Sequence, residues 1–75
     1  MNNVIEKIIY PLFGEEKEKE AFYEKKKSLA EEATKVDSAW ENFYLRTEYS
    51  LPNGEKWFYY EDTEYGIPSS LERIA

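Results

Sequence analysis

The sequence predicts an α+β fold in which two N-terminal helices pack on one face of an antiparallel β-hairpin, followed by a short C-terminal helix. Two observations support this prediction. Apolar residues recur with helical spacing over the first forty residues and alternate with period two from Phe43 onward. Nine of the thirteen aromatic residues lie between Trp40 and Tyr65, on both sides of Pro52-Asn53-Gly54. At 75 residues, the chain is expected to form a single small domain.

The first helix is predicted over residues 3–10. Asn3 and Glu6 have the spacing of a capping box, which marks a helix start. Pro11 cannot donate a backbone hydrogen bond, so the helix should end near Tyr10. One helical face would carry the four apolar residues Val4, Ile5, Ile8 and Ile9.

A second, long helix is predicted over residues 15–36. Its first turn is rich in glutamates, which suit the positive end of a helix dipole. Its apolar seam has a period near 3.5 and comprises Phe22, Leu29, Ala33, Val36 and Trp40. Lys26 stands in this seam where a larger apolar residue would be expected.

Residues 37–43 allow two interpretations. Ser38 and Glu41 form a second capping-box pattern, which favours a short new helix over 38–43 after a break near Asp37. Alternatively, the long helix continues to about Phe43. We favour the break.

The hairpin is predicted over residues 43–61. A two-residue Asn53-Gly54 turn would place Tyr49 opposite Phe58. A type I turn centred on Pro52 and Asn53, with Gly54 in a left-handed bulge, would instead place Tyr49 opposite Trp57. Pro52 suits the second geometry and would remove a strand donor in the first, so we favour the bulged turn.

The bulged turn divides the hairpin side chains into two faces. The face expected to form the core with Val4, Ile5, Ile8, Phe22 and Leu29 carries Phe43, Leu45, Thr47, Tyr49, Leu51, Trp57 and Tyr59. The other face carries Tyr44, Arg46, Glu48, Ser50, Lys56, Phe58 and Tyr60. One layer of helices cannot cover both faces, so the second face needs a separate explanation.

The last element predicted is a short helix over residues 69–75. Ser69 and Glu72 give a third capping-box pattern, preceded by Pro68. Leu71 and Ile74 would form its apolar side, and one or two turns would fray readily.

Composition argues against several activities. The chain has no cysteine and no histidine, which removes the commonest metal ligand, the commonest general base and the best nucleophile. We therefore expect no enzyme, no catalytic residue, no metal and no cofactor. The longest apolar run, residues 8–13, contains Pro11 and is too short to cross a bilayer, so we expect a cytoplasmic protein without membrane contact.

The net charge of −6 is concentrated in the aromatic half, with −2 in residues 1–40 and −4 in residues 41–75. Nucleic-acid binding requires a lysine and arginine footprint, so direct binding is not expected. A larger protein with a basic surface is the expected partner.

The sequence thus favours a non-enzymatic protein-binding module, such as a small acidic inhibitor or modulator of the kind that phages and other mobile elements encode against host defence. The expected contact residues are Tyr44, Glu48, Phe58, Tyr60, Glu61 and Asp62. Cover of the aromatic rings by Arg46 and Glu48 is the competing interpretation of this face. Two other functions stay open: a homodimeric small subunit that assembles through the aromatic hairpin, and an acidic mimic of nucleic acid.

Overall fold

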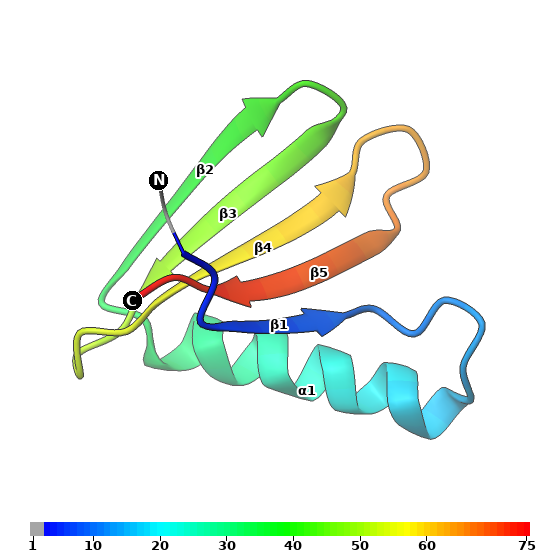
Figure 1. The fold of residues 1–75 in the computed structure, drawn as a ribbon, viewed down its shortest axis with the longest axis horizontal. Coiled ribbons are helices and arrows are strands. Elements are labelled where there is room, and N and C mark those ends of the chain that lie inside the picture. The colour runs from blue at the N-terminus through cyan, green and yellow to red at the C-terminus, as the bar shows by residue number, and fades with distance from the viewer. Residues whose placement is uncertain (1–2) are drawn as a thin grey trace.

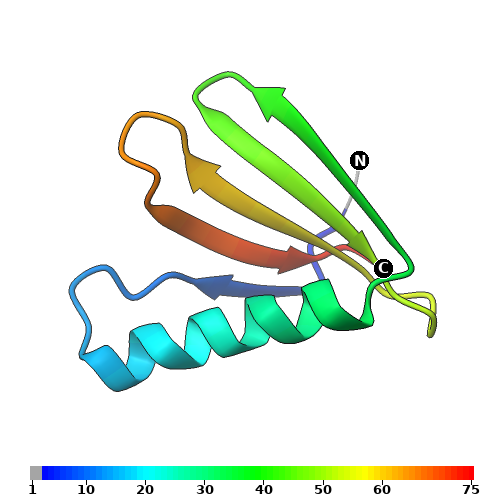
Figure 2. The same cartoon turned by 180° about the vertical axis from the view of Figure 1, so that it is seen from behind.

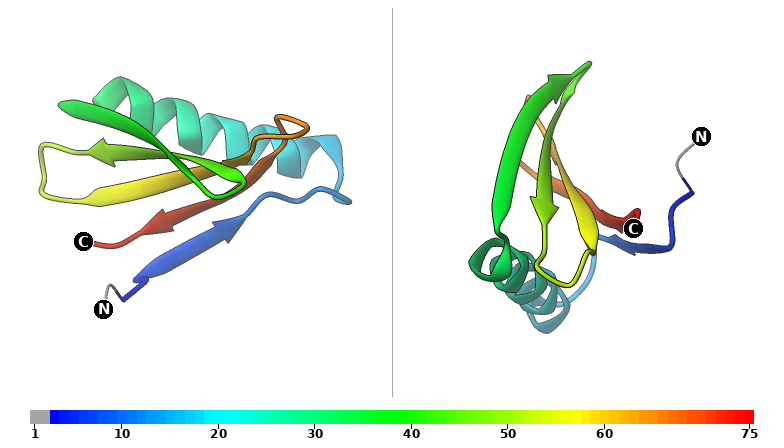
Figure 3. Two further views of the ribbon diagram at one scale, coloured as in Figure 1. Left: turned by 90° about the horizontal axis from the view of Figure 1, so that it is seen from above. Right: turned by 90° about the vertical axis from the view of Figure 1, so that its left-hand side faces the viewer.

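The computed structural model describes residues 3–75, which form five strands and one helix. In chain order these are β1 (Glu6–Ile9), α1 (Glu16–Glu32), β2 (Lys35–Glu41), β3 (Tyr44–Ser50), β4 (Lys56–Asp62) and β5 (Pro68–Arg73) (Figure 1). The strands make one antiparallel sheet in the order β1-β5-β4-β3-β2. The helix lies against one face of this curved sheet (Figures 2 and 3). The predicted arrangement of two N-terminal helices and a short C-terminal helix around a single hairpin is wrong, because the structure has one helix and a five-stranded sheet.

The central hairpin confirms the predicted turn and register. Tyr49 lies opposite Trp57 in the β3–β4 pairing. The amide of Gly54 donates to the Leu51 carbonyl at 3.1 Å, and the Leu51 amide donates to the Glu55 carbonyl at 2.9 Å. Gly54 has φ of 92°, the left-handed conformation that a bulged type I turn requires.

The predicted N-terminal helix over residues 3–10 is wrong, because this segment contains strand β1. Ile8 pairs with Leu71 of β5 and packs against the core, whereas its neighbour Ile9 points outward and is exposed. Such alternation is strand behaviour. An apolar segment this short fits both the helical period and the strand period. Pairing with β5 makes it a strand.

The predicted C-terminal helix over residues 69–75 is also wrong. Strand β5 runs between β1 and β4, and Leu71 faces both Ile8 and Tyr59 across the sheet. Pro68 is the first residue of the strand, a position where its missing amide donor is tolerated.

The long helix ends four residues earlier than predicted, and the segment expected to form a short helix over 38–43 is strand β2. Ala33 already has an extended backbone, with φ of −63° and ψ of 136°. The Thr34 amide donates to the Ser50 carbonyl at 2.8 Å, which leads the chain into pairing with β3. Val36 and Trp40 therefore belong to a strand and not to the helical seam.

The core lies between α1 and the middle of the sheet. It comprises Phe22, Leu29, Tyr49, Leu51, Trp57, Tyr59 and Leu71, with Ile8, Tyr10 and Ala33 at its margin. The Lys26 ammonium lies 4.5 Å from the Tyr59 ring centroid, so the lysine in the helical seam covers an aromatic ring. Three residues predicted for the core are exposed instead, namely Val4, Ile5 and Phe43.

Candidate functional site

Three chain connections meet at one end of the sheet. These are the segment from β1 to α1, the β2–β3 turn and the β4–β5 loop (Figure 1). Both the amide and the hydroxyl of Thr63 donate to the Phe43 carbonyl, at 3.1 and 2.9 Å, which fixes the β4–β5 loop against the β2–β3 turn. The Tyr10 amide donates to the Ser69 carbonyl at 2.9 Å, which holds the segment after β1 against the start of β5. This end of the molecule is therefore held together by backbone hydrogen bonds.

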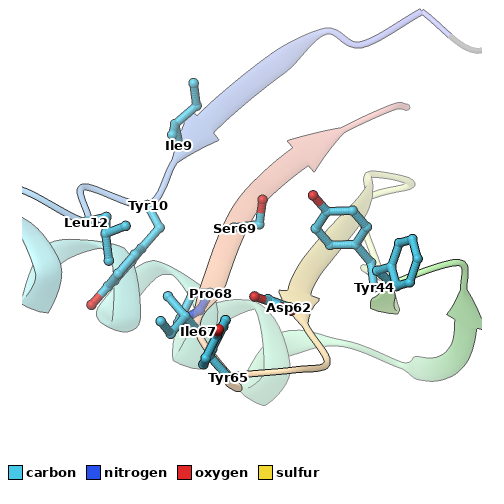
Figure 4. Close-up of a pocket in the computed structure, with 10 residues that line it drawn as sticks. Ile9, Tyr10, Leu12, Tyr44, Asp62, Tyr65, Ile67, Pro68 and Ser69 are labelled. Carbon is cyan, nitrogen blue, oxygen red and sulfur yellow. The ribbon is translucent and has the colours of Figure 1, made fainter.

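The three connections surround an open depression of about 700 Å³ (Figure 4). It is lined by Ile9, Tyr10, Leu12, Phe43, Tyr44, Asp62, Tyr65, Ile67, Pro68 and Ser69. We call these ten residues the loop-end depression. Most are apolar or aromatic, and such a concave lining is suited to an apolar side chain of a partner.

Aromatic side chains at the depression are unusually open to solvent. Phe43 is 78% exposed and Tyr65 is 71% exposed. Asn42, which precedes Phe43, adopts φ of 56°, a left-handed conformation that asparagine tolerates in turns. The tight turn leaves Phe43 outside the core although its sequence position suggested the core face.

One lining residue of the depression, Asp62, is acidic. Asp62 lines it and accepts a hydrogen bond from the Glu64 amide at 2.8 Å, which shapes the β4–β5 loop. An apolar depression with this carboxylate in its lining would be complementary to an apolar group next to a basic residue.

Five of the six predicted contact residues lie on the sheet face opposite the helix, and Glu61 lies on the other face. Tyr44, Glu48, Phe58 and Tyr60 share the sheet face opposite the helix, as the register requires. Tyr44 and Asp62 pair across β3 and β4 and both line the loop-end depression. Glu61 lies on the helix side, where it accepts a hydrogen bond from the Tyr59 hydroxyl at 2.7 Å.

Phe58 is largely covered by its own sheet and is only 8% exposed. The Arg46 guanidinium carbon lies 4.7 Å from its ring centroid, and the Tyr60 ring meets it edge-on at 6.2 Å. Arg46 also pairs with Glu41 at 3.3 Å, and Glu48 lies 4.0 Å from the Lys56 ammonium. Arg46 therefore covers the Phe58 ring, which agrees with the competing interpretation of this face.

The Tyr59 hydroxyl stays protonated near neutral pH and donates its hydrogen bond to Glu61. Burial raises the pKa of its phenol, and the hydrogen bond to the Glu61 carboxylate raises that pKa further. The pair is best described as a structural link at the edge of the core.

Sequence reasoning missed most of the depression. The sequence predicts Ile9 in a helix and Phe43 in the core, and it suggests no role for Tyr65. The turn-forming Asn42 and Gly66, both with positive φ, are the sequence signals that accompany the two exposed aromatic residues.

Within residues 3–75, no group of three or more acidic, histidine or cysteine side chains could hold a metal ion. Across the same residues, no helix is both long and apolar enough to span a membrane.

A separate polar cluster fastens the β3–β4 turn to the core. The Trp57 indole donates to Glu55 Oε1 at 2.9 Å, and Asn53 Nδ2 donates to Glu55 Oε2 at 3.1 Å. The Arg73 guanidinium lies 3.8 Å from the same carboxylate. The hydrogen bond from Trp57 lowers the pKa of the Glu55 carboxyl below its ordinary value of 4.5, and the positive charge of Arg73 acts in the same direction.

This lowered pKa predicts an acid-sensitive contribution to stability. The ionised carboxylate stabilises the folded chain above pH 4.5, and that contribution is lost as pH falls through the lower folded-state pKa. Glu55→Gln should therefore be less stable than the natural chain at neutral pH, with the difference shrinking in acid. Thermal unfolding across a pH series measures this difference in stability. Glu31→Gln, at an exposed position of the helix, is the control. A difference independent of pH would contradict the prediction.

Comparison with protein families, with curated proteins and with solved structures finds no match to this chain.

Proposed function

We propose that this protein is a non-enzymatic binding module that captures a larger protein through the loop-end depression. The observation that carries the proposal is the exposure of Phe43 and Tyr65 beside a concave apolar lining. Aromatic side chains bury a large area at little entropic cost and are common anchors at interfaces. Backbone hydrogen bonds between the three connections keep the anchors in place, which lowers the cost of ordering them on binding.

The charge supports a partner with basic groups around an apolar protrusion. The net charge of the chain is −6, and Asp62 lines the depression. Such a partner fits a small acidic inhibitor or modulator acting in the cytoplasm, as mobile elements use against host proteins. Of the contact residues expected from the sequence, we keep Tyr44 and Asp62, because both line the depression.

Mimicry of nucleic acid has less support from the surface. On the open sheet face, meaning the face opposite the helix, carboxylates alternate with basic side chains. Lys7 pairs with Glu72 at 3.4 Å, and Arg46 pairs with Glu41 at 3.3 Å. A nucleic-acid mimic would instead present carboxylates in rows like phosphates.

The proposal predicts that Phe43→Ser and Tyr65→Ser each weaken capture of the partner by roughly 30-fold, the loss typical of truncating an aromatic anchor. Affinity capture with quantitative mass spectrometry identifies the partner, and titration with the purified partner measures the loss. Phe13→Ser is the matched control, since Phe13 is fully exposed but lies outside the depression.

The salt dependence separates the two candidate functions. Capture anchored by apolar side chains beside a few charges should weaken only modestly from low to high salt, whereas binding by a nucleic-acid mimic should weaken steeply. Equal capture by all three variants would rule out the loop-end depression as the binding site. In that case Phe58→Ala and Tyr60→Ala would test the open sheet face.

A further inference from the structure

Strand β2 is a long, open sheet edge. It spans seven residues, all of them exposed, and pairs with β3 in a regular register without a bulge. On its other side, residues 3–75 provide no neighbouring strand. Figure 3 shows β2 at one edge of the curved sheet and β1 at the other. β1 has only four residues and is soon followed by Pro11, so β2 is the edge better able to accept another strand.

Two apolar side chains on this edge have no cover. Val36 is half exposed and Trp40 is 74% exposed, although both are on the sheet face against which the helix packs. Their partners in β3 are better covered, since Tyr49 is buried and Leu45 is half-buried. The helix thus leaves the β2 margin open, and pairing with another strand would cover these two residues.

The side-chain order along β2 is complementary to itself in the antiparallel sense. With Ser38 as the midpoint, Lys35 mirrors Glu41 and Val36 mirrors Trp40. We propose that β2 pairs with β2 of a second copy of this chain about a two-fold axis at Ser38. The two sheets then join into one ten-stranded antiparallel sheet with both helices on the same side.

This register forms two kinds of favourable pair and places no like charges directly opposite each other. Lys35 lies opposite Glu41 of the partner subunit, twice by symmetry, and Val36 lies opposite Trp40 of the partner subunit, also twice. Unlike charges and aromatic–β-branched pairs directly opposite each other stabilise antiparallel strands. Asp37 meets only Ala39 of the partner subunit.

The neighbouring symmetric registers are worse. Centring the axis on Asp37 would place that carboxylate against its own copy, and centring it on Ala39 would place Asp37 against Glu41 of the partner subunit. Like charges directly opposite each other destabilise paired strands. A shift by a single residue would bring opposite sheet faces together and separate Val36 from Trp40. Charge therefore selects the Ser38 register among these alternatives.

Forming the new ion pairs costs little within each chain. Lys35 pairs with Asp37 at 3.4 Å, but both side chains are more than half exposed. Exposed ion pairs contribute little to stability, so Lys35 can exchange one carboxylate for another. Glu41 pairs with Arg46 at 3.3 Å and can accept a second cation, because a carboxylate has two oxygens.

The proposed β2 interface shares no residue with the loop-end depression, so self-association is separate from the proposed function. Capture of a partner through the loop-end depression can fail while the dimer forms, and the reverse also holds.

The test is a pair of charge reversals followed by sedimentation velocity from micromolar to millimolar concentration. The natural chain should dimerise. Lys35→Glu and Glu41→Lys should each self-associate about tenfold more weakly, because each places two like-charged pairs across the interface. An equimolar mixture of the two variants should regain association as a heterodimer, since every charge then faces its opposite. This mixing step separates a true interface from a folding defect.

The absence of cysteine allows a second, chemical test of the register. Ser38→Cys places two thiols opposite each other across the axis, within the separation that a disulfide spans, and mild oxidation should yield a covalent dimer. Ala39→Cys is the control and should cross-link far less, because it faces Asp37 of the partner subunit. A natural chain that stays monomeric at millimolar concentration, or a variant mixture that does not associate, would overturn the proposal.

Discussion

Trp57→Ala is expected to lower the free energy of unfolding by about 3–5 kcal/mol, the range for removing a fully buried aromatic side chain. Trp57 is 1% exposed and is the largest fully buried side chain in the core. A domain of this size has a total stability of only about 5–15 kcal/mol, so a large fraction would be lost. Urea unfolding followed by circular dichroism measures the change, since that signal does not depend on tryptophan.

Trp40→Ala supplies a matched control with the same chemical change. Trp40 is on the uncovered part of β2, so at low protein concentration its replacement should change stability by about 0.5 kcal/mol or less. The loss of stability in Trp57→Phe should lie between those of Trp57→Ala and Trp40→Ala. Phenylalanine keeps most of the apolar volume but cannot donate the indole hydrogen bond to Glu55. Equal losses for Trp57→Ala and Trp40→Ala would contradict the packing of α1 on the sheet.

The hairpin could be predicted because its determinants are local. Pro52, Asn53 and Gly54 select one turn geometry, and that geometry fixes the register of the flanking strands. Once Tyr49 faces Trp57, the period of two assigns each remaining side chain to a face. This is why Tyr49, Leu51, Trp57 and Tyr59 were placed correctly in the core.

The other three strands could not be predicted because their determinants are distant in sequence. All three capping-box patterns, beginning at Asn3, Ser38 and Ser69, were interpreted as helix starts, and each lies in or beside a strand. β1 pairs with β5, β2 with β3, and β5 with both β4 and β1, and these long-range backbone hydrogen bonds outweigh a weak local preference for helix.

The candidate site was harder to predict than the fold. Whether Phe43 is core or surface depends on Asn42 turning the chain one residue before β3 begins. Arg46 covers the Phe58 ring because the two residues lie on neighbouring strands. The sequence was compatible with this contact but equally with an exposed ring. Exposure at a loop depends on contacts such as that between Thr63 and Phe43, twenty residues apart in the chain.

Leu71→Ala tests directly whether the C-terminal segment is a central strand or a frayed helix. Leu71 is 0% exposed and lies between Ile8 and Tyr59 in the sheet, so its truncation leaves a cavity that cannot collapse easily. We expect a loss of about 2–5 kcal/mol in the free energy of unfolding. In a frayed terminal helix the same change would cost little, because the side chain would already be hydrated.

Leu12→Ala is the matched control, since Leu12 lies in the segment between β1 and α1 and is about half exposed. Its replacement should cost less than about 1 kcal/mol, as expected for a surface side chain. Urea unfolding of both variants under one set of conditions gives the comparison. If Leu71→Ala cost no more than Leu12→Ala, β5 would not be in the sheet. β1, which pairs with the rest of the sheet only through β5, would then lose its place as well.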